Sequence, residues 1–206
     1  MSTKIAYVTG GMGGIGTAIC QRLHKMGYKV IAGCGPSRDY DKWLGEQKAQ
    51  GYTFYASVGN VADWDSTSAA FTKAVQEHGV IDVLVNNAGI TRDKSFLKMT
   101  RMMWDEVLGV NLNGPFVITQ SVLPGMMEAG WGRVINLASI VGLTGNFGQA
   151  NYSAAKLGIA SDDVKTKEVI KAEHVTKRYG DRTIIKDLSL KVTRGDRIGI
   201  VGSNGA

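Results

Sequence analysis

Short runs of hydrophobic residues alternate with longer stretches whose hydrophobic residues recur at helical spacing over the first 160 positions of the chain. Compact runs of this kind, separated by amphipathic helices, are typical of a parallel sheet covered by helices. The pattern predicts five strands, over residues 5–8, 29–33, 52–57, 81–85 and 132–137. It also predicts helices over residues 15–27, 41–51, 63–78 and 100–127, with Asp63 as the N-cap of the third.

This order of elements predicts an α/β protein with a Rossmann-like, doubly wound parallel sheet. Right-handed crossovers between parallel strands place helices on both faces of such a sheet. Residues 1–160 are therefore expected to form one nucleotide-binding domain.

The pattern changes near residue 160. Residues 165–171 are mostly charged, Leu188, Leu190 and Val192 alternate like a half-buried strand, and residues 198–201 form another apolar run. We expect residues 161–206 to be a short, β-rich segment foreign to the first domain. The first sheet would then be truncated after its fifth strand, which would keep an open edge.

Composition and charge narrow the function classes. The chain has 206 residues and a net charge of +6, but its basic and acidic residues are interleaved without an aromatic ladder, so no nucleic-acid partner is expected. Two cysteines without CxxC spacing and three isolated histidines predict neither a disulfide framework nor a metal site. The apolar run at residues 5–8 is too short for a signal peptide or a membrane span, so we expect a cytoplasmic protein without membrane association.

A glycine-rich segment lies between the first predicted strand and the first predicted helix. Glycines at such a place let the backbone turn sharply and approach a pyrophosphate, while N–H groups at the helix start face the anion. Its position after the first strand favours a dinucleotide-binding loop over a tight turn without a ligand. The segment consists of Thr9, Gly10, Gly11, Met12, Gly13, Gly14, Ile15 and Gly16.

The second predicted strand ends without a carboxylate. An acidic residue at this place binds the ribose 2′-hydroxyl of NAD, whereas an arginine accommodates the 2′-phosphate of NADP. This chain has Gly33-Cys34-Gly35-Pro36-Ser37-Arg38, and its first acidic residue here is Asp39. Arg38 therefore favours NADPH as the cofactor, although it could also be a surface charge without a ligand.

Tyr152 and Lys156 stand four residues apart among good helix formers, which places them on one helix face. A phenol alone is a weak proton donor at neutral pH, and a neighbouring ammonium stabilises the phenolate that proton transfer leaves. The pair could also belong to an exposed helix face. Ser139 and residues 86–89 favour a catalytic role, because each follows a predicted strand and ligands bind at the carboxyl ends of parallel strands.

Together these motifs resemble the short-chain dehydrogenase/reductase family. The resemblance covers about residues 3–159 and implies a Rossmann-like fold with a nicotinamide cofactor. The motifs that carry it are Thr9-Gly10-x-x-x-Gly14-x-Gly16, Asn86-Asn87-Ala88-Gly89, Asn111, Ser139 and Tyr152-x-x-x-Lys156.

The resemblance also implies a role for each motif. Tyr152 would protonate the substrate oxygen, and Lys156 would hold the nicotinamide ribose. Ser139 would hydrogen-bond the substrate carbonyl, and Asn111 would hold a water of the proton relay. The cofactor would be bound by Gly10, Met12, Gly14, Ile15, Gly16, Arg38, Asn60, Val61, Asn87, Ala88, Gly89, Tyr152 and Lys156.

Several segments further resemble the acetoacetyl-CoA reductases of polyhydroxybutyrate synthesis, a group within that family. This likeness implies NADPH-dependent reduction of acetoacetyl-CoA to (R)-3-hydroxybutyryl-CoA by a homo-oligomer, with Asp93 and Gln149 lining the acyl site. Reduction of a 3-oxoacyl group on a carrier protein is the alternative, and the acyl chain length stays open. The likeness rests on residues 6–16, 33–36, 59–65, 89–93, 130–133 and 147–149.

Residues 161–206 resemble the start of an ATP-binding cassette domain instead. Residues 171–180 are similar to its first strand, where Tyr179 would stack on adenine, and residues 199–206 are similar to the strand and loop that approach phosphate. The pattern G-x-x-x-x-G-K-[ST] is not completed in the sequence, so ATP hydrolysis is not expected. Cofactor binding is more firmly expected than turnover, and a non-catalytic dinucleotide-binding fragment is the alternative function.

Overall fold

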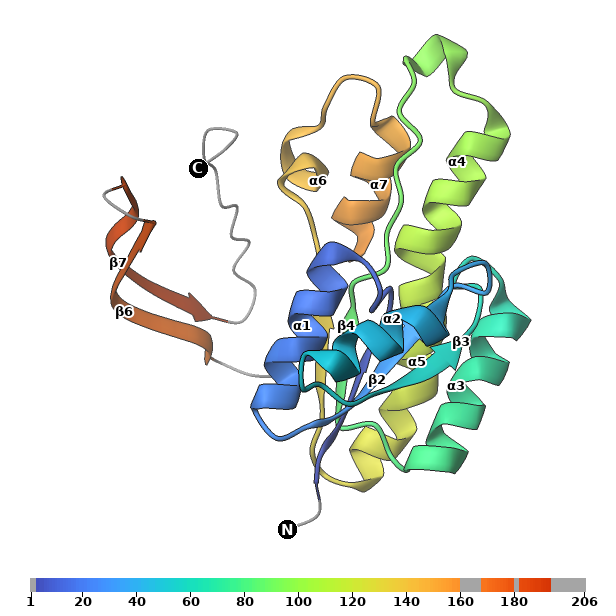
Figure 1. Cartoon of the computed structure of the whole chain (residues 1–206). Coiled ribbons are helices and arrows are strands. Elements are labelled where there is room, and N and C mark those ends of the chain that lie inside the picture. The colour runs from blue at the N-terminus through green and yellow to red at the C-terminus, as the bar shows by residue number, and fades with distance from the viewer. Residues whose placement is uncertain (1–2, 160–167, 180–181, 194–206) are drawn as a thin grey trace. The chain divides into compact units, whose positions relative to one another are not determined.

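The computed structural model describes residues 3–159, 168–179 and 182–193. The chain divides into two compact units, Met1–Ile159 and Ala160–Ala206. The first unit contains a five-stranded sheet with helices on both faces, and two further strands belong to the second unit (Figure 1). The predicted α/β class with a doubly wound parallel sheet is confirmed.

All neighbouring strands of the five-stranded sheet run parallel, in the order β3-β2-β1-β4-β5. The central strand β1 pairs with β2 on one side and with β4 on the other, so that Ala6 lies opposite both Val30 and Val83. The strand order reverses between β1 and β4, and ligands of such sheets bind at the carboxyl ends of the strands beside this reversal. The strands are β1 (Ile5–Val8), β2 (Lys29–Cys34), β3 (Phe54–Val58), β4 (Val83–Asn86) and β5 (Arg133–Asn136).

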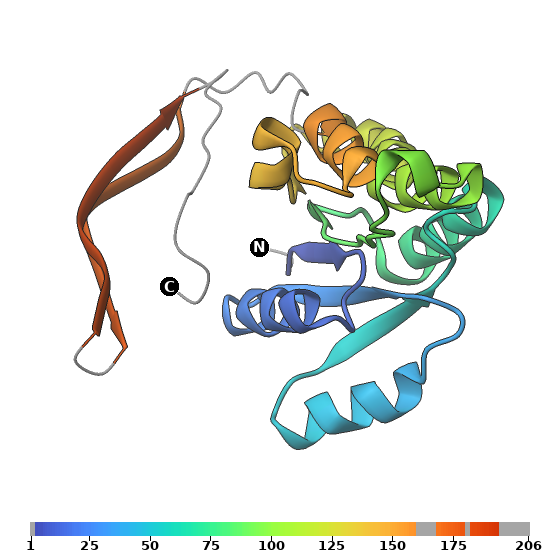
Figure 2. The same ribbon diagram turned by 90° about the horizontal axis from the view of Figure 1, so that it is seen from above.

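Seven α-helices surround this sheet in the described part of the first unit. Helices α1 and α2 cover one face, and α3, α4 and α5 lie on the other, as the view from above shows (Figure 2). Their bounds are α1 Gly14–Lys25, α2 Tyr40–Ala49, α3 Trp64–His78, α4 Arg101–Leu108, α5 Gly114–Glu128, α6 Ile140–Thr144 and α7 Ala150–Ile159; a 3-10 turn covers Phe96–Lys98 and a π-helical turn covers Gly109–Asn113.

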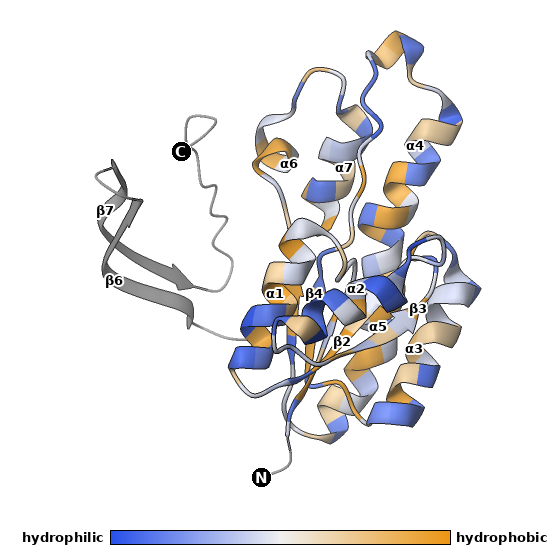
Figure 3. Ribbon diagram, viewed as in Figure 1, coloured by the Kyte–Doolittle hydropathy of each residue, from blue (hydrophilic) through white to orange (hydrophobic). Residues whose placement is uncertain are grey.

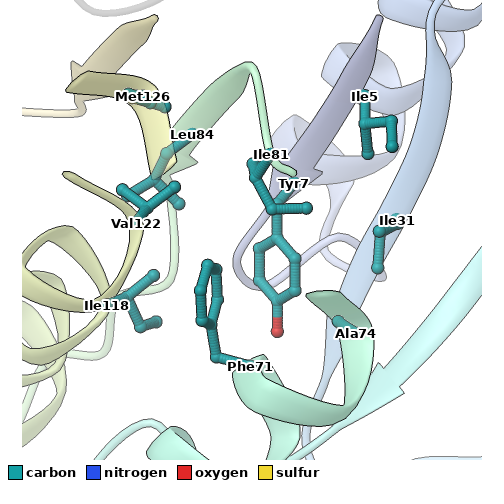
Figure 4. Packing of buried hydrophobic residues seen from close by; sticks show 10 residues of the cluster. All are labelled: Ile5, Tyr7, Ile31, Phe71, Ala74, Ile81, Leu84, Ile118, Val122 and Met126. Carbon is teal, nitrogen blue, oxygen red and sulfur yellow. The ribbon is translucent and has the colours of Figure 1, made fainter. Parts of the chain in front are cut away.

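Successive side chains of a strand point to opposite faces, so each face of the sheet has its own hydrophobic core. Tyr7 of β1 packs toward α3 and α5, where its ring lies 5.7 Å from the ring of Phe71 (Figure 4). Ala6 and Val8 pack toward α1 and α2, together with Cys20. Hydrophobic positions are accordingly concentrated on the strands and on α5 (Figure 3).

Helix starts follow the expected capping chemistry. Asp63 accepts a hydrogen bond from the N–H of Ser66 at 2.7 Å, as predicted for the start of α3. Asp39 caps α2 and Thr100 caps α4 in the same way. Such side chains satisfy N–H groups that have no partner within the helix.

The helical region predicted over residues 100–127 is confirmed, and it contains one irregularity that the pattern did not reveal. The structure has α4, a π-helical turn over Gly109–Asn113, and then α5. Gly114 lies so close to Val61 that a side chain there would overlap it, and Pro115 follows in the first turn of α5. The hydrophobic pattern continues through this turn within the helix, which explains why the pattern did not reveal it.

The fourth strand and the first helix differ from their local patterns in detail. The strand predicted over 81–85 begins at Val83 in the structure. Ile81, two residues earlier, is 1% exposed and packs in the hydrophobic core outside the strand. Helix α1 packs on the sheet through the buried Gly16 and Cys20 and the partly buried Ile19 and Leu23. Ile15 in its first turn is 67% exposed.

Strand β5 is an edge of the five-stranded sheet, as the expectation of an open edge implied. Val134 packs against the core, whereas Ile135 on the opposite face is 48% exposed. Within the described residues, β5 therefore has a paired side toward β4 and an unpaired side.

In the second unit, β6 (Glu168–Tyr179) and β7 (Arg182–Thr193) pair antiparallel. The pairing contains several register shifts, for example between Ala172 and Val175. The strand predicted around residues 188–192 is part of β7. The apolar run at 198–201 and the phosphate-loop resemblance at 199–206 lie outside the described residues.

Candidate active site

The glycine-rich segment forms a tight turn between β1 and α1. Gly10 has φ = 62°, a backbone conformation that favours glycine. Its carbonyl accepts a hydrogen bond from the N–H of Gly13 at 3.1 Å, and a side chain at position 16 would overlap the same carbonyl. The N-cap Gly13 has no side chain to cap the first N–H groups of α1, which leaves the positive end of the helix open to an anion.

The loop after β4 is fastened to this turn by Thr9 and Asn87. The Asn87 amide donates to the main-chain oxygens of Thr9 and Gly10 at 2.8 and 3.1 Å. The Thr9 hydroxyl accepts from the N–H groups of Asn87 and Ala88, both at 2.9 Å. These bonds fix two loops to each other at the strand-order reversal.

Both loops line one cleft of about 420 Å³ at the carboxyl ends of the strands. All the residues predicted to bind the cofactor line this cleft, except Tyr152 and Lys156. Seven other lining residues were not among those assigned to the cofactor from the sequence. These are Gly13, Gly33, Cys34, Gly35, Gly59, Ile90 and Val110.

The end of the cleft beside β2 carries no negative charge from its lining residues. Burial raises the pKa of the Cys34 thiol to about 11, so this side chain is neutral at pH 7. Its sulfur donates to the main-chain oxygen of Ala32 at 3.3 Å. Arg38 is exposed at the same end and is a lining residue. These surroundings suit an anionic group such as a ribose 2′-phosphate better than a neutral ribose diol.

Lys156 is 4% exposed on α7, and its ammonium donates to the main-chain oxygen of Leu137 at 2.8 Å. Its nitrogen lies 5.8 Å from the centre of the Tyr152 ring, on the same helix. Burial lowers the pKa of Lys156, because the charged form loses solvation. Two residues after Leu137, Ser139 caps the short helix α6 by accepting from the N–H of Val141 at 3.3 Å.

Asn111 is fully buried in the π-helical turn that interrupts the predicted long helix. Its amide donates to the main-chain oxygens of Ile90 and Val107, both at 2.8 Å, and its oxygen accepts from the N–H of Ile90 at 3.2 Å. Because both amide protons are used, a water held by this side chain would have to donate its own proton. A side chain at Gly89 would come within 2.7 Å of the Asn111 oxygen and 3.7 Å of the Lys156 nitrogen.

The two predicted substrate residues are in direct contact. Gln149 donates to the Asp93 carboxylate at 3.0 Å, although 56 positions separate them in sequence. Beside this bond, the N–H of Lys94 donates to the oxygen of Gly148 at 2.9 Å. The structure thus joins the loop after β4 to the segment that precedes α7.

Asn151 is a buried residue of this site that the pattern did not reveal. Its amide donates to the main-chain oxygens of Arg92 and Met103 at 3.3 and 3.1 Å, and its oxygen accepts from the N–H of Tyr152 at 2.8 Å. It therefore fixes the position of α7 next to Tyr152. The only signal in the sequence is a polar residue directly before the tyrosine, which does not distinguish a buried anchor from a surface residue.

Other kinds of site have no support in the described part of the chain. No group of three or more histidine, cysteine or acidic side chains there could hold a metal ion. None of the described helices is both long and apolar enough to cross a bilayer.

Comparisons with known proteins agree with the motifs. A family model for short chain dehydrogenases matches residues 4–166. An acetoacetyl-CoA reductase of Cupriavidus necator is 55% identical over 177 residues, which are 85% of this chain and 72% of that protein. An acetoacetyl-CoA reductase of Allochromatium vinosum is 47% identical over 158 residues, 76% of this chain and 64% of that protein. A 3-oxoacyl-[acyl-carrier-protein] reductase of Aquifex aeolicus is 44% identical and is covered over 63% of its length. The chain therefore spans between 63% and 72% of these curated relatives.

Proposed function

This chain belongs to the short-chain dehydrogenase family, and on that premise we propose that it reduces a 3-oxoacyl thioester to the (R)-3-hydroxyacyl thioester with NADPH. The preferred substrate is acetoacetyl-CoA. The observation that carries the proposal is a single cleft whose lining joins the phosphate loop, Asn87 and Gly89, with the buried Lys156 close to Gly89.

The residues of the cleft fit a dinucleotide. The open N-terminus of α1 suits a pyrophosphate, and a side chain at Gly16 would close the turn that forms this site. Asn60 and Val61 line the cleft near the end of β3, where the adenine would lie. A bound nicotinamide cofactor would supply the hydride for the reaction.

The preference for NADPH rests on the end of β2. Cys34 is neutral, and the exposed Arg38 can approach a 2′-phosphate with a bidentate guanidinium. The alternative that Arg38 is a surface charge predicts equal affinities for NADPH and NADH, and a binding measurement distinguishes the two.

The catalytic residues would act on the substrate carbonyl. Ser139 would donate a hydrogen bond to the carbonyl oxygen, and Tyr152 would give that oxygen a proton as the carbonyl carbon gains hydride. The buried Lys156 ammonium would stabilise the phenolate left on Tyr152. A water at Asn111 would return a proton to the pair from solvent.

Support for the substrate comes from the relatives and from the contact between Asp93 and Gln149. Two of the relatives are named acetoacetyl-CoA reductases, and a third is named for an acyl-carrier-protein substrate. In this chain, Asp93 and Gln149 are held together by their hydrogen bond and present polar groups at the segment before Tyr152. We assign them to the acyl site, with coenzyme A preferred over carrier protein.

A homo-oligomer is part of the same proposal. Phe116, Leu123 and Met127 recur along α5 at helical spacing and are 56%, 41% and 78% exposed. An exposed apolar stripe on one helix favours association with a second copy. Light scattering behind size-exclusion chromatography measures the state directly.

The test of the proposed function is product formation by the purified full chain with NADPH. Acetoacetyl-CoA and an acetoacetyl carrier protein are offered separately, and the configuration of the 3-hydroxy product is determined. We expect faster turnover of acetoacetyl-CoA and an (R) product. Turnover of neither thioester, with NADPH still bound, would contradict this function and indicate a non-catalytic dinucleotide-binding protein.

A further inference from the structure

A chain of hydrogen bonds connects α2 to the back of the phosphate loop. The indole nitrogen of Trp43 donates to the Thr17 hydroxyl at 3.2 Å, and this hydroxyl donates to the main-chain oxygen of Gly11 at 3.1 Å. Trp43 belongs to α2 and Thr17 to α1, whereas Gly11 lies in the loop itself. The phosphate loop, α1 and α2 are thereby linked.

The direction of these bonds follows from the chemistry of the groups. An indole N–H can only donate, so the Thr17 oxygen must be the acceptor of the first bond. A main-chain oxygen can only accept, so the single hydroxyl proton of Thr17 must point to Gly11. The bond from Trp43 therefore orients the hydroxyl, and loss of the indole N–H would free the hydroxyl to rotate.

Gly11 is the part of the loop that is packed against the protein. Its N–H donates to the oxygen of Gly33 in β2 at 3.0 Å, and a side chain there would approach the Ala32 side chain to 2.7 Å. Gly11 does not line the cleft, whereas its neighbours Gly10 and Met12 do. The bond from Thr17 thus fixes the loop from behind without occupying the ligand side.

Trp43 is itself held firmly. It is 8% exposed, and its ring stacks on Phe54 of β3 with centroids 5.5 Å apart and an angle of 25°. A second bond between the same helices, from Gln21 to Gln47 at 2.8 Å, strengthens the link of α1 to α2. Because α2 begins just after Arg38, Trp43 also fixes the helix that follows this residue.

We infer that Trp43 and Thr17 are positioning residues for the cofactor, which set the phosphate loop and its distance from the 2′-phosphate end of the cleft. This inference rests on the proposed function, because it assumes that the cleft binds NADPH. Neither side chain lines the cleft, so both act through the loop and not by contact with the cofactor.

The test is the affinity of the full chain for NADPH, measured by titration calorimetry, in variants that keep the packing. Thr17→Val removes the hydroxyl at constant shape, and Thr17→Ser keeps the hydroxyl. Trp43→Phe keeps an aromatic ring beside Phe54 and removes the donor. Trp131→Phe is the matched control, because Trp131 lies next to Lys4 and does not line the cleft.

Loss of one neutral hydrogen bond corresponds to a weakening of roughly 2–10-fold. We expect this loss in Thr17→Val and Trp43→Phe, and near-normal affinity in Thr17→Ser and Trp131→Phe. The double variant of Thr17→Val with Trp43→Phe should bind like Thr17→Val alone, because both changes interrupt one chain. Normal affinity in Thr17→Val and Trp43→Phe, or equal weakening in Trp131→Phe, would overturn the inference.

Hydrogen exchange of residues 9–17 without cofactor separates this inference from the proposed function. Faster exchange in Thr17→Val and Trp43→Phe, with no change in Thr17→Ser, supports the relay. If the unmodified chain binds no NADPH, the proposed function is wrong. Hydrogen exchange alone then tests whether Thr17 and Trp43 position the loop. Unchanged exchange in both Thr17→Val and Trp43→Phe would overturn this inference.

Discussion

The ammonium nitrogen of Lys156 lies 2.8 Å from the main-chain oxygen of Leu137, to which it donates a hydrogen bond. Leu137 follows β5 directly, and Ser139 comes two positions later. This bond links α7, which carries Tyr152, to the strand end that carries Ser139. Ser139, Tyr152 and Lys156, three of the four candidate catalytic residues, are thereby fixed relative to one another at the carboxyl end of the sheet.

The buried ammonium gives the folded protein a pH-dependent stability. Burial lowers the pKa of Lys156 below its unfolded value, so the unfolded chain binds more protons between the two values. At pH values below both pKa values, the buried ammonium lowers the free energy of unfolding by its full amount. This penalty disappears as the pH rises from the folded to the unfolded pKa. The stability of the unmodified protein relative to Lys156→Met should therefore rise as the pH increases above neutrality.

Thermal unfolding of both proteins over a series of pH values measures this difference. Lys48→Met, at an exposed position of α2, serves as the control and should show no such trend. A constant difference between the unmodified protein and Lys156→Met over the whole alkaline range would show that the buried charge carries no penalty.

Gly16→Ala should destabilise the protein and abolish NADPH binding. The new methyl group would overlap the Gly10 carbonyl, and relief of such an overlap typically costs about 1–3 kcal/mol. Urea unfolding measures the free energy. Gly45→Ala is the control, because Gly45 lies in α2 with open space around it, and it should stabilise by up to about 1 kcal/mol. If the Gly16→Ala protein were as stable as the Gly45→Ala protein, the turn would accommodate a side chain at position 16, which contradicts the overlap with the Gly10 carbonyl.

The motifs allowed the fold of the first unit to be predicted, because each strand is a short apolar run and each crossover is an amphipathic helix. The π-helical turn between α4 and α5 could not be predicted in this way. At the end of this turn, Gly114 closely approaches Val61, a contact between residues 53 positions apart that no local pattern records. The turn contains Asn111, so the pattern located the residue but not the π-helical geometry that holds it.

The sequence singled out most of the residues that line the cleft, and it singled out the pair Tyr152 and Lys156 on α7. Glycines, Tyr152 and Lys156 have spacings that follow from the chemistry of phosphate binding and proton transfer. Residues that position these groups without lining the cleft have no such spacing. Asn151 is identified by two hydrogen bonds to segments distant in the chain, and Trp43 by a bond across 26 positions.

Arg38→Ala should lower the affinity for NADPH by roughly 10–100-fold, the size expected for a charge-assisted hydrogen bond to phosphate. The affinity for NADH should stay unchanged, because NADH has no 2′-phosphate. Fluorescence titration with both cofactors measures the two values. Arg22→Ala, at an exposed position of α1, is the charge-matched control. Equal losses for the two cofactors, or equal losses in the control, would place Arg38 outside the 2′-phosphate site.

The central claim is that the cleft and the Tyr152 helix together reduce a 3-oxoacyl thioester. Its most direct test is the rate of NADPH oxidation with acetoacetyl-CoA by the unmodified chain and by Tyr152→Phe, with NADPH affinity measured on both. We predict turnover by the unmodified chain, a loss of at least roughly 100-fold in Tyr152→Phe, and similar NADPH affinities, since the phenol acts in proton transfer. Equal rates in the two proteins, or no oxidation by the unmodified chain, would contradict the claim.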